Sequence, residues 1–388
     1  MKIIENCWYP HELMYCGNVH PCTSVEELIA QVELHLLPIK RARKLKRMHL
    51  GLWLNQSLLS QLCSCDKLRT QWFELLSEHN LTIKSLNAFP QTEFHGKEIK
   101  ELVYFPEWCQ QSRLDYTKLL ADFIALYPAV FVQNITISTV PLGYKASWNS
   151  DKQKSAIKNL GEIANYLAAI KQDNGIHIRL CLEMEPDCQL ESSAELIDFF
   201  KRDLKIDTQV NNASHLGACY DICHQAVMFE DIISSLVAIE ENNIVIGKIQ
   251  VSNAMSFKVV NLAKVQSKLK RFNRSPYLHQ MKVQSASGIV SFPDLDFNLL
   301  NKFSPQEQVR IHFHLPINSH NVTEELETTQ NAILEVVSML ASMKNKPDLE
   351  IETYTWLVMV DALGLNECLI KELNWLEKSL TKLNLIIN

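Results

Sequence analysis

The feature that most constrains the fold is a repeated alternation of short apolar runs with longer helical stretches along the 388 residues. Nine runs rich in Val, Ile, Leu and aromatic residues are each followed by polar residues, Gly or Pro. This order is typical of βα units, which build a parallel sheet covered by helices. We predict a single α/β domain over residues 1–388, an eight-stranded (β/α)8 TIM barrel with extended βα loops. The candidate strands are Leu13–Val19, Met48–Leu54, Leu81–Phe89, Ile135–Val140, Ile176–Leu182, Leu216–Tyr220, Asn243–Val251, Val309–Leu315 and Leu349–Tyr354.

Nine candidate strands are one more than such a barrel contains. We expect either Val309–Leu315 or Met48–Leu54 to lie outside it. The stretch 252–308 lacks clean alternation, so it is predicted to form an extended loop or a small subdomain over the mouth of the barrel.

The helical stretches between these runs have start signals and one apolar face. Small polar residues precede Glu by three positions at Ser24, Ser192 and Asn321, which is the pattern of a capping box. In Lys152–Gln172 the apolar residues recur at helical spacing, as do leucines near the C-terminus. Each of these helices is expected to pack against the sheet.

Charge and composition argue against several functional classes. The net charge is −6 and the pI is about 6.1, so no basic field favours a nucleic-acid partner, and the run Lys40–Arg47 is interpreted as a solvated helix end. No stretch has the length of a transmembrane segment, and Glu5 and Asn6 interrupt the start where a signal peptide would be apolar. The eleven cysteines have no repeated CxxC pairing. We therefore expect a cytoplasmic protein with reduced thiols.

Histidines and carboxylates gather where the candidate strands end, which is where TIM barrels place their working residues. A buried carboxylate is costly unless it is paired or binds a cation. Several that converge make a divalent metal the simplest hypothesis. The strand-end candidates are Asn87, Glu183, Glu185, Asp221, His224, Lys248, Gln250, His312, His314, Glu352 and Trp356.

Each signal alone has a simpler interpretation. A strand-end Glu is commonly a cap or an ion-pair partner, and Asp221 can be the N-cap of a helix that carries His224 in its first turn while both still face the pocket. His312 and His314 lie two apart, so on a strand they face the same side, either as ligands or as hydrogen-bonded core histidines. Position alone also makes pocket-lining candidates of His20, His95 and His279.

These strand ends resemble the EboE family of xylose-isomerase-like TIM barrels. The similar segments extend from Tyr15 to Trp356. They are Tyr15–Pro21, Asn87–Pro90 with Phe94–Gly96, Val103–Trp108, Ser138–Gly143, Leu182–Pro186, His215–Val227, Gly247–Ser252, Tyr277–Gln280, His312–Pro316 and Glu352–Trp356.

The resemblance implies a place among sugar isomerases, sugar-phosphate epimerases and apurinic-site endonucleases. In that superfamily a Glu, an Asp, a His and a final Glu hold the metal, which implies Glu183, Asp221 and Glu352 here. His224 resembles a His that contacts substrate. Gln250 stands where relatives have His; its neutral oxygen would favour Mn²⁺ or Mg²⁺ over Zn²⁺, unless His312 or His314 takes that place or no metal is bound.

Three hypotheses follow. The first is a metal-dependent isomerase or epimerase that moves a proton through an ene-diolate of a polyhydroxy substrate, with Glu183 and Glu352 as base and acid. Lys248, Lys145 or Lys97 would bind an anionic end of that substrate. The second is a non-catalytic barrel that binds and hands over a metabolite, as the EboE resemblance implies, in association with other Ebo-cluster proteins. A ring of aromatic residues at the mouth motivates it: Phe89, Tyr104, Phe105, Trp108, Tyr144, Tyr354 and Trp356.

The third hypothesis is a metal-dependent phosphoester hydrolase. Such an enzyme needs three metals and a basic groove, and the acidic balance of this chain disfavours it.

Overall fold

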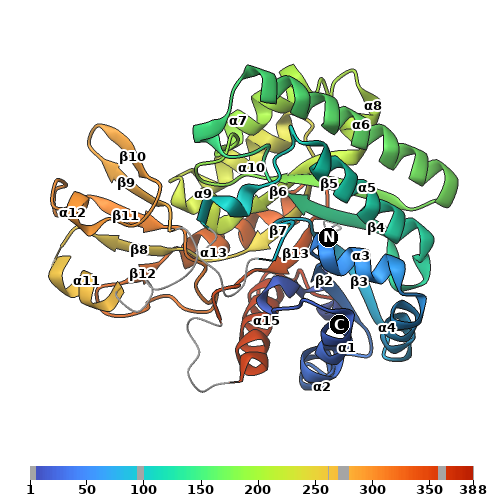
Figure 1. The fold of residues 1–388 in the computed structure, drawn as a ribbon. Helices are drawn as coiled ribbons and strands as arrows, with labels where there is room; N and C mark the ends of the chain where they lie inside the picture. The colour runs from blue at the N-terminus through green and yellow to red at the C-terminus, as the bar shows by residue number, and fades with distance from the viewer. Residues whose placement is uncertain (1–5, 94–99, 261, 270–278, 357–363, 388) are drawn as a thin grey trace.

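The computed structural model describes residues 6–93, 100–260, 262–269, 279–356 and 364–387. Eight parallel strands form one sheet in the order β1-β13-β7-β6-β5-β4-β3-β2. The two edge strands meet through a bridge between Cys16 and Gly51, so the sheet curves into an α/β TIM barrel (Figure 1). The barrel strands are β1 (Met14–Tyr15), β2 (Met48–Trp53), β3 (Leu81–Asn87), β4 (Phe131–Thr139), β5 (His177–Glu183), β6 (Leu216–Asp221), β7 (Ile246–Val251) and β13 (Asp348–Ile351).

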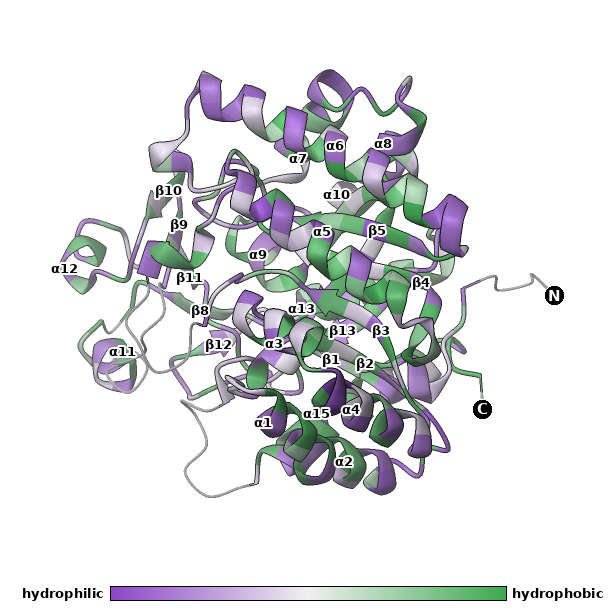
Figure 2. Ribbon diagram, turned by 45° about the vertical axis from the view of Figure 1, so that its right-hand side comes forward, coloured by the Kyte–Doolittle hydropathy of each residue, from purple (hydrophilic) through white to green (hydrophobic). Residues whose placement is uncertain are grey.

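Helices surround the barrel and bury one face against it. In Figure 2 strands β4 and β5 are mainly hydrophobic, whereas the helices around them alternate hydrophobic and hydrophilic segments. The helices outside the second sheet are α1 (Val25–Gln31), α2 (Leu37–Ala42), α3 (Gln56–Ser64), α4 (Asp66–Glu78), α5 (Gln111–Leu126), α6 (Ser150–Asn174), α7 (Ser193–Asp198), α8 (Val210–His215), α9 (Ile222–Val227), α10 (Ile232–Glu241), α13 (Gln330–Met339) and α15 (Leu365–Thr381). Single 3₁₀ or π turns occur at Pro10–Glu12, Gly17–Val19, Val32–Leu36, Lys100–Tyr104, Pro128–Val130, Lys145–Ser147, Phe199–Asp203 and Leu340–Ser342.

The predicted helix frame is confirmed for the two longest helices. On α6 the residues Leu160, Ile163 and Leu167 are fully buried. Gly175 caps the end of α6, and its φ of 74° is a left-handed conformation that glycine adopts freely. Leu373 and Leu380 of α15 are likewise buried. The capping patterns at Ser24 and Ser192 also start helices.

The helix start predicted at Asn321 was wrong. Asn321 forms an isolated bridge with Glu327, and the next helix, α13, begins only at Gln330. A capping box needs a helix behind it, and here the chain pairs as strand β12 instead.

A second sheet, antiparallel, lies between β7 and β13 in the chain. Its order is β10-β9-β11-β8-β12, and it projects to one side of the barrel in Figure 1. The candidate Val309–Leu315 contributes β11 to this sheet, whereas Met48–Leu54 supplies barrel strand β2. A small apolar core of its own includes Phe257, Val283 and Val309. The elements of this region are β8 (Met255–Lys258), α11 (Leu262–Leu269), β9 (Met281–Ser285), β10 (Gly288–Phe292), α12 (Phe297–Leu300), β11 (Gln308–Ile311) and β12 (Glu327–Thr328).

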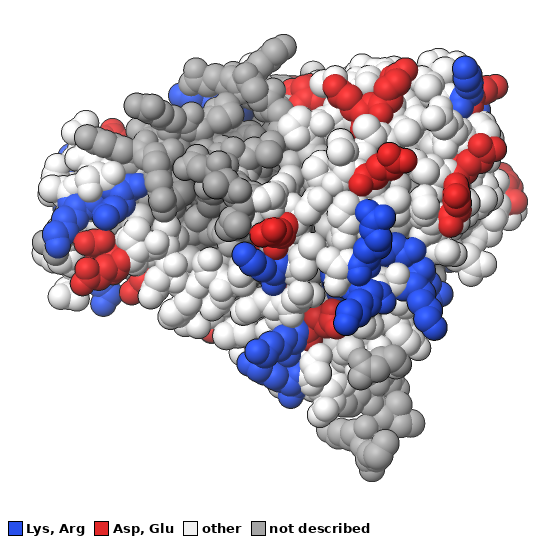
Figure 3. Space-filling model, turned by 90° about the horizontal axis from the view of Figure 1, so that it is seen from below, with Lys and Arg blue, Asp and Glu red and all other residues white. Residues whose placement is uncertain are grey.

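On the face drawn in Figure 3, Lys and Arg form small groups separated by acidic side chains and by wide uncharged areas. Among the described residues, every helix is too short or too polar to cross a membrane.

The barrel interior leaves no room for a side chain at Gly51. A Cβ there would lie 2.0 Å from Glu350 Oε2 and 3.0 Å from Tyr15 O. We expect Gly51→Ala to lower the free energy of unfolding by about 1–3 kcal/mol, the usual cost of overpacking. Chemical denaturation monitored by circular dichroism measures it.

Gly161 in α6 is the matched control, because an added Cβ there meets nothing within 4 Å. Gly161→Ala should leave stability unchanged or raise it by up to about 1 kcal/mol. Equal effects of the two substitutions would contradict the crowding at Gly51.

Candidate functional site

Three carboxylates meet at the C-terminal end of the barrel. Glu183 ends β5, Asp221 ends β6 and Glu352 follows β13, and all three are buried, with exposed fractions of 4%, 0% and 8%. One oxygen of each lies within 4.8 Å of the others. The parallel register brings the ends of these strands to one edge, so residues far apart in sequence become neighbours.

Hydrogen bonds fix two of the three carboxylates. Asn18 Nδ2 donates to Glu352 Oε1 at 2.7 Å. Asp221 Oδ1 accepts from the Ser252 hydroxyl at 2.8 Å and from the His224 backbone N–H at 2.9 Å, which makes Asp221 the N-cap of α9 as well. Asp221 Oδ2 is buried and has no hydrogen-bond partner among the described residues.

The electrostatics of this cluster favour a cation. Burial raises the pKa of Glu352 to about 8, with the nearby Asp221 charge adding to the rise. Burial, with repulsion from Glu352 and Asp221, holds the pKa of Glu183 well above its usual range. Within the described parts of the chain, no Lys or Arg forms an ion pair with any of the three. The converging oxygens, the unpaired Asp221 oxygen and the repulsion fit a divalent cation held by Glu183, Asp221 and Glu352.

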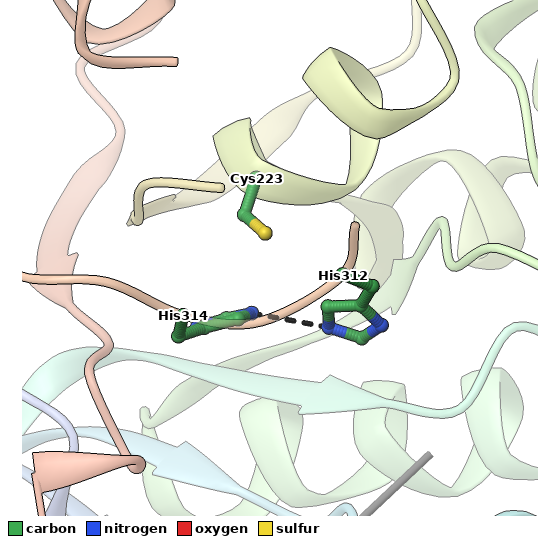
Figure 4. A group of neighbouring side chains, drawn as sticks. All are labelled: Cys223, His312 and His314. Atoms are coloured by element: carbon green, nitrogen blue, oxygen red, sulfur yellow. Dashed lines mark hydrogen bonds between the residues drawn. The ribbon is translucent and has the colours of Figure 1, made fainter. Parts of the chain in front are cut away.

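A group of histidines lies beside the carboxylates. His312 and His314 follow β11 of the second sheet, and their Nε2 atoms are 3.2 Å apart. Figure 4 shows the two rings facing each other. His312 Nε2 also lies 3.0 Å from His224 Nε2, in the first turn of α9. Both lie beyond the strand that we expected to carry them, because β11 ends at Ile311, yet their rings still face each other. The second sheet therefore supplies side chains to the end of the barrel.

Except for Asp221, these groups line a cavity that is partly open to solvent. Its polar part includes Glu183, Glu352 and the three histidines, and its other wall is largely aromatic and aliphatic. The carboxyl group of Glu185 belongs to the polar part; it accepts a 3.2 Å hydrogen bond from the Tyr104 hydroxyl, and burial raises its pKa to about 7. The lining residues are Asn18, Phe89, Pro90, Lys100, Val103, Tyr104, Glu183, Glu185, His224, Gln280, His312, His314, Glu352 and Tyr354.

Three predicted site residues use their polar groups inside the barrel and do not line the cavity. Lys248 is fully buried; its amine contacts Glu350 Oε1 at 2.9 Å and Asn87 Oδ1 at 3.0 Å. Asn87 Nδ2 in turn donates to Glu350 Oε1. Gln250 Nε2 donates to the same Asn87 oxygen, and Gln250 Oε1 is a buried acceptor with no partner among the described residues. Gln250 therefore keeps one oxygen available for a ligand role.

The other predicted positions lie elsewhere. His20 hydrogen-bonds Tyr15 and stacks on His35 at 4.1 Å, lining a separate hollow between α1 and the barrel. His279 stacks on Phe313, and its Nδ1 is 3.6 Å from Asp294. The indole of Trp356 donates to Glu372. His95 falls outside the described residues.

Sequence reasoning missed Asn18 and Gln280 as site residues. Asn18 lies two residues before the candidate His20 in the first strand-end motif, so the pattern could have identified Asn18 as a site residue. Gln280 precedes β9 of the second sheet and reaches the cavity through tertiary packing alone, with no local signal.

Glu372 holds the two segments that carry the site. It is fully buried on α15, and its carboxylate accepts from Ile317 N, from the Thr353 hydroxyl and from the Trp356 indole, at 3.0, 2.8 and 2.7 Å. Thr353 directly follows Glu352, and Ile317 lies three residues after His314. Glu372 therefore positions both the last carboxylate and the histidine segment.

Burial raises the pKa of Glu372 to about 7. Because the folded pKa lies above the ordinary value, the contribution of this group to stability is complete below about pH 4.5 and is lost as the pH rises through 7. Glu372→Gln should remove that part of the pH dependence. The wild-type-minus-variant difference in unfolding free energy is expected to fall by up to about 3 kcal/mol between pH 4.5 and 8. A pH-independent difference in denaturant titrations would refute this.

The comparisons with known proteins concern the fold. No family sequence model matches the chain, and curated proteins give no match. Among solved structures, a xylose isomerase domain protein from Planctomyces limnophilus matches with a TM-score of 0.53 at 12% identity, over 97% of this chain and 99% of that one. A putative sugar phosphate isomerase/epimerase from Anabaena variabilis gives 0.52 at 10% identity, over 95% and 98%. A D-tagatose 3-epimerase-like protein gives 0.52 at 13% identity, over 96% and 98%. The chain thus has the fold of xylose isomerase-like TIM barrels, and these similarities do not single out the EboE family within it.

Proposed function

We propose that this protein is a divalent-metal-dependent isomerase or epimerase of a small polyhydroxy or sugar-like metabolite. The observation that carries the proposal is the convergence of Glu183, Asp221 and Glu352, with oxygens within 4.8 Å, at the cavity end of the barrel. Oxygen donors of this kind suit Mn²⁺ or Mg²⁺. The names of the fold neighbours, isomerases and epimerases of sugars, agree with this class.

The chain's own residues can perform the proton transfers. A bound divalent cation would polarise a substrate carbonyl and its neighbouring hydroxyl. In the sheet, β6 and β7 separate β5, which carries Glu183, from β13, which precedes Glu352, so the two carboxylates approach a substrate from different sides. One can take the proton from the carbon beside the carbonyl, and the other can return a proton to the ene-diolate. Asn18 orients Glu352 through its 2.7 Å hydrogen bond.

His224 and Glu185 complete the polar part of the cavity. Both line it, and the gap of 3.8 Å between His224 Nε2 and Glu185 Oε2 leaves them close enough to contact one substrate hydroxyl. Neighbouring carboxylates raise the pKa of His224, Asp221 most, although burial opposes them. We assign substrate binding to this pair, which can hold a hydroxyl group directly or through a cation bound beside it.

The test is exchange of substrate protons with solvent. The purified protein, loaded with Mn²⁺, Mg²⁺ or Zn²⁺, is incubated in D₂O with a panel of aldoses, ketoses and their phosphates, and exchange and isomer formation are followed by NMR and mass spectrometry. Loss of exchange in Glu352→Gln with metal retained supports the proposal; unchanged exchange would refute the role of Glu352. Glu230→Gln is the control, because this carboxylate only accepts bonds from Ser193, which an amide oxygen can also accept.

One observation favours a second candidate, a non-catalytic barrel that binds and hands over a metabolite. Part of the cavity wall is apolar, formed by Phe89, Val103, Tyr104 and Tyr354. Such a wall suits a ligand with an aromatic or prenyl part. For this candidate we propose the metabolite-traffic role that the strand-end resemblance to the EboE family implies, in association with other Ebo-cluster proteins. This candidate would be favoured over the isomerase if the purified protein contains no metal and if a chelator changes neither its ligand binding nor its melting temperature.

A further inference from the structure

Three imidazole nitrogens converge beside the carboxylate cluster. His224 Nε2 lies 3.0 Å from His312 Nε2, which lies 3.2 Å from His314 Nε2. All three side chains are buried, at 3%, 6% and 1% exposure. They come from two elements distant in the chain, the first turn of α9 and the segment after β11. The meeting of the three rings is therefore a product of the tertiary fold.

The other nitrogen of each ring identifies which atom carries the proton. His224 Nδ1 lies 2.8 Å from Met184 O, and His314 Nδ1 lies 2.8 Å from Glu352 O. A carbonyl oxygen only accepts, so each Nδ1 must donate. A neutral imidazole with its proton on Nδ1 has a lone pair on Nε2.

His312 follows the same rule through a glutamine. Its Nδ1 lies 2.9 Å from Gln280 Oε1. The orientation of the Gln280 amide is set by its nitrogen, which donates to Pro186 O at 3.3 Å and to the Tyr104 hydroxyl. The oxygen therefore faces His312, and His312 Nδ1 is also a donor.

His312 Nε2 thus faces the lone pair of His224 on one side and that of His314 on the other, in a buried space. A proton on one Nε2 would bond well to a single neighbour and leave the third nitrogen without a partner. A metal ion between them satisfies all three. In a tetrahedral zinc site with Zn–N distances of about 2.0–2.1 Å, two ligand nitrogens are about 3.3 Å apart. The two contacts that His312 Nε2 makes, 3.0 Å to His224 and 3.2 Å to His314, are within a few tenths of an ångström of that value.

We propose that His224, His312 and His314 hold a second divalent cation of the zinc class, next to the carboxylate site. Three imidazoles suit Zn²⁺ or Co²⁺, whereas three carboxylates suit Mn²⁺ or Mg²⁺. The hydrogen bonds from Nδ1 to oxygen are the arrangement that orients metal-binding histidines. The site does not depend on the isomerase function proposed above.

A carboxylate completes the coordination. Glu185 has an oxygen within 4.8 Å of the ligand nitrogens of His224 and His312, and Asp221 has one within 4.8 Å of those of His224 and His314. Cys223 also points its sulfur toward His312 and His314 in Figure 4.

Metal titrations of the full-length, metal-depleted protein test the site. Zn²⁺ binding is measured by calorimetry and mass spectrometry, and Co²⁺ is used as a probe because tetrahedral coordination by imidazole gives visible absorption. The wild type should bind Zn²⁺ and show the Co²⁺ absorption. His312→Gln and His314→Gln should each lose both, with affinity reduced by about 100-fold or more. His215→Gln is the matched control: His215 is buried and its Nδ1 also faces a carbonyl, Ile178 O at 2.8 Å, but it lies before β6 at the opposite end of the barrel.

The outcomes separate this site from the carboxylate site. Glu352→Gln should retain the Zn²⁺ affinity and the Co²⁺ absorption of the wild type, whether or not the protein is an isomerase. Thermal melts establish that each variant is folded, and the Co²⁺ spectrum of the wild type requires no variant at all. Absence of that absorption, or Zn²⁺ affinities of both histidine variants equal to that of the wild type, would overturn the proposal.

Discussion

Replacing Asp221 by Asn should abolish cation binding at the carboxylate site while leaving the fold intact. Asp221 Oδ1 caps α9 and accepts from Ser252, and the amide oxygen of Asn can do the same. Asp221 Oδ2, which has no partner among the described residues, becomes an NH₂ group that cannot bind a cation. Replacing a residue that only orients a metal ligand typically weakens metal binding by about 10–100-fold. Asp221 is expected to be a ligand itself, so the Mn²⁺ affinity of this variant should fall by at least about 100-fold.

The same substitution should affect stability in opposite directions with and without metal. Without metal, Asn removes a buried carboxylate that raises the pKa of both Glu183 and Glu352 and whose Oδ2 has no partner among the described residues, so the variant should melt at a higher temperature than the wild type. With Mn²⁺ at about 100 times its dissociation constant, the wild type gains about 2.7 kcal/mol and the variant gains nothing. Calorimetry and thermal melts measure both effects.

Asp231→Asn provides the control. Asp231 caps α10 through a 2.8 Å bond from Ser234 N, the same local role as that of Asp221, but it is exposed. This variant should bind Mn²⁺ like the wild type. If Asp221→Asn keeps its Mn²⁺ affinity, Asp221 is not a ligand.

Removing the amine of Lys248 should produce the largest loss of stability. Lys248 and Glu350 are both fully buried, the Lys248 amine lies 2.9 Å from Glu350 Oε1, and Glu350 Oε2 has no hydrogen-bond partner among the described residues. Lys248→Met leaves a buried carboxylate without its cation, which costs about 3–5 kcal/mol. Denaturant unfolding of the metal-free protein measures this loss.

The double variant Lys248→Met/Glu350→Gln distinguishes loss of charge balance from loss of packing. It removes both charges, so it should recover most of the stability lost in the single variant. If the double variant is as unstable as Lys248→Met, the ion pair is not the cause.

The barrel could be predicted from the sequence because its strands are short apolar runs that alternate with helices of clear periodicity. The sequence did not show which candidate strand lies outside the barrel, because β11 and β2 have similar apolar patterns. They differ in their partners: β11 pairs with β8 and β9, whereas β2 pairs with β3 and is bridged to the end of β1. Strand partners are set by tertiary packing, which a local pattern does not record.

The carboxylate cluster could be predicted from the sequence, because the C-terminal ends of all the barrel strands lie at the same end of the barrel. The role of Lys248 could not be predicted from the sequence. The pattern of a lysine on an apolar strand is the same whether that lysine binds a substrate or pairs with a buried glutamate such as Glu350. The histidine trio was foreseen in part: the spacing of His312 and His314 placed them together, but their meeting with His224 depends on how the second sheet packs on the barrel.

The most direct test of the account is a crystal grown with Mn²⁺ and measured near the manganese absorption edge. We expect an anomalous peak bounded by Glu183, Asp221 and Glu352. A fully ordered barrel end with these side chains in place and no peak among them would contradict it.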